Sequence, residues 1–150
     1  MNENQLEQKL HSEGLNLASI NKRAIAFTID EILISVLFAV IFWDKLSSIK
    51  EAEVMIKYSQ SLFVYIMAVK VIYQSVFVYM YGATLGKLAM KIRVVETTYL
   101  GLPSIQESII RAVMRVLSEM LFYFGFIVAF FSPLRLTWQD RISKTLVVDV

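Results

Sequence analysis

The sequence lacks cysteine, and its single histidine is His11. Without thiols the chain can form no disulfide, no thiolate metal site and no cysteine nucleophile. A single histidine also excludes a metal site built from several histidine ligands. No nucleophile stands beside a base in a recognisable motif, and no cofactor signature is present. We therefore expect neither an enzyme nor a bound metal or cofactor.

Charged residues are also scarce. They make up 19% of the 150 residues, whereas soluble domains average about 25%. The net charge of +2 is too small to indicate nucleic-acid binding. Hydrophobic residues instead reach 57%, with 10 phenylalanines, which is more apolar surface than one soluble domain of this length can bury. The composition therefore indicates an integral membrane protein.

Two apolar segments are long enough to cross a bilayer. The first is residues 24–43, interrupted by Asp30 and Glu31, and the second is residues 61–81, whose one charge is Lys70. A helix needs about 20 apolar residues to span the hydrocarbon core. We therefore predict one transmembrane helix in each segment.

The chain beyond the second span predicts a small β element. Residues 91–94 alternate between polar and apolar side chains at the period of a strand. Residues 145–150 are apolar and β-branched enough for a second short strand. We expect residues 92–96 and 145–150 to pair, which requires both to lie on one side of the membrane.

A third hydrophobic element covers residues 105–134. Ser104, with Glu107 in the capping-box position, predicts a helix start. The first half carries charges at a spacing of four: Glu107, Arg111, Arg115 and Glu119. Residues 120–134 carry none, and fifteen helical residues reach only about 22 Å. This element is either re-entrant or interfacial, or it is a third full span.

Basic residues near the spans mark the cytoplasmic side of a membrane protein. They gather before the first span, after the second and in the tail: Lys22, Arg23, Lys87, Lys91, Arg93, Arg135, Arg141 and Lys144. The polar connection at 44–60 has balanced charge. This pattern favours an even number of crossings, with both termini in the cytoplasm. We predict an all-α membrane protein with two transmembrane helices, a re-entrant or interfacial helical element, and a cytoplasmic two-stranded β element.

Ionised side chains within a span cost about 2.5–3.5 kcal/mol each even on a lenient insertion scale. Because the two spans run in opposite directions, Asp30, Glu31, Lys70 and Gln74 lie at similar depths. We expect Lys70 to meet Glu31 or Asp30, and Gln74 to hydrogen-bond Asp30. This network is either a proton or cation pathway with Asp30 as the exchangeable carboxylate, or a polar contact that fixes helix packing.

Basic residues outside the two spans are candidates for contact with anionic lipid headgroups. They are Lys87, Lys91, Arg93, Arg111 and Arg115. For the two arginines, the spacing favours i,i+4 pairs with glutamates on a wetted helix face. The alternative is that they face Asp30 or Asp140 within the membrane.

Four motifs in this order resemble the RDD family of small integral membrane proteins, named for one arginine and two aspartates. They are Leu17-Ala18-Ser19 with Arg23 and Asp30, Gly82-Ala83-Thr84-Leu85-Gly86-Lys87 with Arg93-Val94-Val95, Arg111, and Asp140-Arg141 with Thr145-Leu146-Val147-Val148. The resemblance covers residues 17–150, after a polar N-terminal segment at 1–16. It identifies Arg23, Asp30 and Asp140 as the named residues. Leu85 stands where the family usually has proline, and Met90 and Lys144 stand where it usually has glycine.

The resemblance implies an integral membrane protein, and transport of a ligand or cation has been suggested for the family. We expect a multi-pass protein of a bacterial inner membrane. One hypothesis is a transport component for protons, cations or small solutes that uses Asp30. Two spans cannot enclose a pathway, so this hypothesis needs a homo-oligomer or a larger membrane partner. The other is a non-catalytic scaffold, assembly or lipid-interacting protein.

Overall fold

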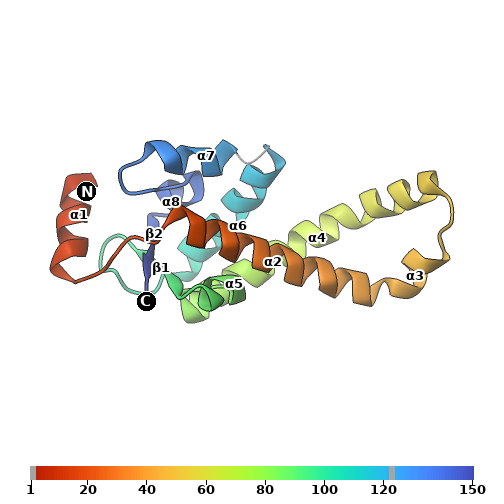
Figure 1. Ribbon diagram of the computed structural model, residues 1–150, viewed down its shortest axis with the longest axis horizontal. Coiled ribbons are helices and arrows are strands. Elements are labelled where there is room, and N and C mark those ends of the chain that lie inside the picture. The colour runs from red at the N-terminus through yellow and green to blue at the C-terminus, as the bar shows by residue number, and fades with distance from the viewer. Residues whose placement is uncertain (1–2, 122–123) are drawn as a thin grey trace.

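The computed structural model describes residues 3–121 and 124–150. Two long helices, α2 (Ile20–Ile41) and α4 (Ala52–Tyr81), form a hairpin, and the short helix α3 (Trp43–Ser48) lies at its tip (Figure 1). The strands, the helix α1 and both chain ends gather at the opposite end of this hairpin (Figure 1). The molecule therefore consists of a long apolar hairpin joined to a compact terminal unit.

Within the described residues, α2 and α4 are the two single helices that are long and apolar enough to cross a membrane. At 1.5 Å per residue, they measure roughly 33 Å and 45 Å. The two predicted spans are therefore present as helices. The predicted polar connection at residues 44–60 is mostly helical, because it contains most of α3 and the first turns of α4, which begins nine residues before the predicted second span. An i,i+4 ion pair, Lys57 to Glu53 at 2.9 Å, supports this extension of α4.

The hydrophobic element predicted at residues 105–134 contains two helices, α6 (Ile105–Met120) and α7 (Phe124–Phe131), which are bent by 104° relative to each other. The capping box is confirmed. The Ser104 hydroxyl accepts the Glu107 N–H at 3.3 Å, and the Glu107 carboxylate accepts the Ser104 N–H at 2.7 Å. Taken as one broken helix, α6 and α7 are apolar enough for a third span, so a re-entrant path stays a prediction.

The predicted strand pairing is confirmed. β1 (Ile92–Glu96) runs antiparallel to β2 (Thr145–Asp149), with Val94 opposite Val147 and Val95 opposite Leu146. One face of this sheet packs against the start of α2 and the end of α4. The cluster formed there consists of Ala18, Ala26, Val78, Ile92, Val94 and Val147. The hairpin and the sheet therefore share a core.

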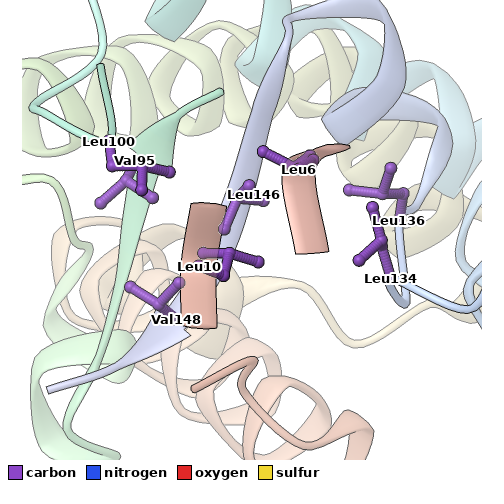
Figure 2. Close-up of a cluster of buried hydrophobic side chains, with 8 residues drawn as sticks. All are labelled: Leu6, Leu10, Val95, Leu100, Leu134, Leu136, Leu146 and Val148. Atoms are coloured by element: carbon purple, nitrogen blue, oxygen red, sulfur yellow. The ribbon is translucent and has the colours of Figure 1, made fainter. Parts of the chain in front are cut away.

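Helix α1 (Glu3–Ser12) covers the other face of the sheet. Its Leu6 and Leu10 are one turn apart and point into the cluster shown in Figure 2, which also holds Val95, Leu100, Leu134, Leu136, Leu146 and Val148. Both faces of the two-stranded sheet are thus buried. This burial accounts for the nearly continuous apolar sequence of β2, since a strand covered on both faces does not alternate.

A short helix precedes each strand of the sheet. Gly82 ends α4 in the left-handed conformation, with φ of 68°. Helix α5 (Leu85–Ala89) follows and leads into β1. Helix α8 (Trp138–Ile142) precedes β2 and begins with a second capping box, formed by Thr137 and Asp140. These short helices bring polar side chains against the N-terminal half of α2.

Candidate functional site: a buried charge cluster beside a cavity

Asp30 of α2 is only 1% exposed, and its carboxylate is surrounded by donors. The Tyr73 hydroxyl and the Gly86 N–H donate to Oδ1 at 2.9 and 2.8 Å, and the Thr84 hydroxyl donates to Oδ2 at 2.7 Å. The Arg115 guanidinium lies 3.7 Å from Oδ2. Because these donors come from α4, the start of α5 and α6, a single carboxylate ties four helices together.

Asp140 is the second buried carboxylate. Arg23 of α2 and Arg111 of α6 both donate to it, and the Thr137 N–H donates at 2.9 Å. Burial alone would raise the pKa of Asp140. The charges of Arg111 and Arg23 outweigh burial and hold this pKa below its ordinary value. Asp140 is therefore ionised at neutral pH and links α8 to α2 and α6.

Lys70 of α4 bridges the hairpin to α6. Its Nζ lies 2.6 Å from Glu31 and 2.8 Å from Glu119. Arg115 approaches the same two carboxylates at 3.5 and 3.3 Å, and its guanidinium lies 4.6 Å above the Phe27 ring. The charges alternate in sign, so each carboxylate has a cation beside it.

These contacts define one buried charge cluster that runs from the spans to α8. Its members are Arg23, Asp30, Glu31, Lys70, Lys87, Arg111, Arg115, Glu119 and Asp140. The cluster as defined holds five basic and four acidic side chains. Its net charge is therefore +1 when all members are ionised.

A cavity of about 260 Å³ lies against this cluster. Its charged lining consists of one carboxylate, Asp30, and four basic side chains: Arg23, Lys87, Arg111 and Arg115. Its apolar lining comes from α2 and α7: Ile20, Ala24, Phe27, Phe126, Ala129 and Phe130. The cavity thus has a basic wall and an apolar wall.

Lys87 is the one member of the cluster, as the described residues show it, that makes no ion pair. It is only 7% exposed. Burial lowers the pKa of Lys87, and the charges of Arg111 and Arg115 lower it further, while Asp30 offsets only part of the effect. A buried cation without a partner is costly. Lys87 is therefore the poorly compensated cation of the cluster, and it lies beside the cavity.

Comparison with known proteins identifies the chain. The profile of the RDD family matches residues 17–144. The chain belongs to the RDD family. No match was found among curated proteins or among solved structures. In this RDD protein, the residues singled out by the sequence resemblance lie together: Arg23 contacts Asp140, and Arg23 and Asp30 line the same cavity.

The structure brings together most of the predicted polar network. Lys70 meets Glu31, as predicted. The predicted hydrogen bond from Gln74 to Asp30 is wrong, because the donors to Asp30 are Tyr73, Thr84 and Gly86. Gln74 is nevertheless buried, at 4% exposed, and lines the same cavity.

The prediction that Lys87, Arg111 and Arg115 lie on the outer surface beside the headgroups is wrong, because they are only 7%, 2% and 6% exposed. The charged face of α6 turns inward, toward the carboxylates Asp30 and Asp140, instead of facing water. Lys91 is exposed and Arg93 is half-buried. For these two residues, contact with headgroups stays a prediction.

Several residues of the site were not predicted. Tyr73, Thr84 and Gly86 hold Asp30, and Glu119 shares Lys70 with Glu31. Tyr73 lies three residues after Lys70 on the same helix face, so its position was a usable signal. The hydrogen bond from the Gly86 N–H could not be predicted from residue types, because it uses only the backbone.

Proposed function

We propose that this RDD protein is a membrane transport component that binds a small charged solute in the cavity beside Asp30. The observation that carries the proposal is the cavity of about 260 Å³ with four basic side chains and a carboxylate in its lining. Burying that many ionised groups next to an apolar hairpin is energetically costly. Binding of a charged solute would explain why these costly buried charges are present.

The proposed placement in the membrane follows from the hairpin. Helices α2 and α4 cross the bilayer of a bacterial inner membrane, with α3 outside and the sheet and both termini in the cytoplasm. Helices α6 and α7 enter from the cytoplasmic side and turn back. Because two crossings cannot enclose a pathway, transport is carried out by a homo-oligomer or with a larger membrane partner.

A specific observation also favours a second function. The three hydrogen bonds that Asp30 accepts connect α2 to α4 and α5, and such a contact stabilises a fold without any exchange of protons. On this alternative the protein is a membrane scaffold, and the charge cluster only fixes how its helices pack.

Flux measurements on Asp30→Asn distinguish the two functions. Proteoliposomes loaded with a pH-sensitive dye should show proton-coupled flux with the wild-type protein when a sodium, potassium or phosphate gradient is imposed. Asparagine cannot exchange a proton, yet it is isosteric with aspartate and keeps most of the hydrogen bonds to Tyr73, Thr84 and Gly86. We therefore expect Asp30→Asn to insert and assemble but to carry no flux.

The matched control is Glu31→Gln, since Glu31 is the neighbouring carboxylate but does not line this cavity. It should keep most of the wild-type flux. If the wild-type protein carries no flux under any of the three gradients, or if Glu31→Gln loses as much as Asp30→Asn, the role assigned to Asp30 fails and the scaffold function is favoured.

A further inference from the structure

The cavity has more positive charge than its own carboxylates neutralise. Arg23 and Arg111 are paired with Asp140, and Arg115 is paired with Glu119. Lys87 makes no ion pair among the residues that the structure describes, although it is 7% exposed and lines the cavity. A buried ammonium of this kind is stabilised when an anion enters and is destabilised in its absence.

Three guanidiniums join Lys87 in the lining of the cavity, those of Arg23, Arg111 and Arg115. Arg111 is 2% exposed, and its buried Nε has no hydrogen-bond partner among the described residues. Cationic donors gathered around one cavity favour an oxyanion with several acceptor oxygens, such as a phosphate group.

Part of the cavity lining has a different chemistry. It is formed by apolar side chains of α2 and α7, among them Phe27 and Phe126, whose rings are 5.4 Å apart. Phe130 also lines the cavity and is 68% exposed, so this wall reaches the outer surface of the protein. A ligand whose anionic group meets the basic wall can thus lay an apolar tail along α2 and α7.

We propose that the cavity binds the phosphate group of an anionic ligand, with Lys87 as the basic residue that pairs with it. This inference rests on the proposed function, because it names the chemical class of the solute at the same site. The phosphate can come from a lipid headgroup, whose acyl chains would follow the apolar wall, or from free phosphate in the cytoplasm.

The protonation of Lys87 supports the same assignment. The charged groups that face it are Arg23 and Asp30 from α2, and Arg111 and Arg115 from α6. Burial and the three guanidiniums lower the pKa of Lys87. A bound phosphate adds negative charge and favours the protonated amine, so ligand binding and proton uptake by Lys87 are coupled.

Ligand-dependent thermal stability of the purified full chain in a nonionic detergent tests the proposal. Dioleoyl phosphatidic acid should raise the unfolding temperature of the wild-type protein, and dioleoyl phosphatidylcholine at the same concentration should not. Inorganic phosphate forms a third arm. A shift with phosphatidic acid alone identifies a lipid headgroup, and an equal shift with inorganic phosphate identifies a free anion.

Lys87→Gln should weaken binding of the active probe by about tenfold or more, whereas Lys91→Gln, which changes an exposed lysine just after α5, should leave it unchanged. Lys87→Arg keeps the charge and should restore part of the affinity. Because Lys87→Gln removes an unpaired buried charge, we expect its apo form to be at least as stable as the wild type.

A second pair of variants does not depend on the folding of Lys87 mutants. Phe130→Glu places a negative charge at the exposed edge of the cavity and should weaken binding. Phe131→Glu, at a residue 85% exposed that does not line the cavity, should not weaken it.

The proposal is overturned if neither phosphatidic acid nor inorganic phosphate shifts the unfolding temperature of the wild type, or if both Lys87→Gln and Phe130→Glu bind as the wild type does. Flux without phosphate binding would reject this inference alone, and binding without flux would reject the transport function alone.

Discussion

Replacing Gly86 by alanine is expected to lower the free energy of unfolding by more than about 3 kcal/mol. A Cβ atom at this position would overlap the carbonyl oxygen of Ala26 on α2 and would lie 2.9 Å from Oδ1 of Asp30. Helix α5 would have to move away from α2, which would also break the hydrogen bond from the Gly86 N–H to Asp30 at 2.8 Å. Packing and hydrogen bonding are therefore lost together.

The control for this substitution is Gly101→Ala. A Cβ atom on Gly101 meets nothing within 4 Å, so the change in stability should be within about 0.5 kcal/mol. Unfolding by SDS in mixed micelles measures both variants under the same conditions. Similar stabilities for the two variants would contradict the close approach of α5 to α2.

Asp140→Asn should cost about 3–5 kcal/mol, the range found when one partner of a buried ion pair is removed. The amide keeps the shape of the side chain but leaves Arg23 and Arg111 without their anion. Asp149→Asn is the matched control, because Asp149 pairs with Lys22 at 2.9 Å on the surface, where the two side chains are 33% and 41% exposed. An exposed pair contributes at most about 1 kcal/mol, and equal losses in the two variants would count against the buried cluster.

The effect of Asp140 should also depend on pH. Its pKa in the folded protein is lower than in the unfolded chain. Its contribution to stability is therefore complete above the unfolded pKa of about 3.9 and is lost as the pH falls through the folded value. The stability difference between wild type and Asp140→Asn should be constant near neutral pH and should shrink in acid.

Local signals in the sequence were enough to predict the helices and the strand pairing. The spans are long apolar runs, and the helix that begins after Ser104 has a complete capping box. The strands at Ile92–Glu96 and Thr145–Asp149 pair as expected from their alternating and apolar residues. Each of these features depends on residues that are close together in the sequence.

The partners of the buried charges could be predicted only in part. Lys70 and Glu31 lie on facing spans at similar depth, so their pairing follows from helix geometry. Lys87 was expected at the membrane surface, because basic residues beside a span usually stay in water or at headgroups. For Arg111 the sequence left two positions open, a wetted helix face or contact with Asp30 or Asp140, and the structure shows contact with Asp140. The burial of both residues depends on Asp30 and Asp140, whose positions in space are set by the packing of α5, α6 and α8 and not by local sequence.

Aqueous access to the cavity can be measured directly, because the chain contains no native cysteine. Thr28 lines the cavity and is exposed, whereas Ile32, one turn further along α2, is 57% exposed but does not line it. Thr28→Cys should react with a membrane-impermeant anionic thiosulfonate, and faster than with a cationic one, because four basic side chains line the cavity. Ile32→Cys should react with neither. If Thr28→Cys is as unreactive as Ile32→Cys, the cavity is closed to water and to charged ligands, and it cannot be the binding site of a charged solute.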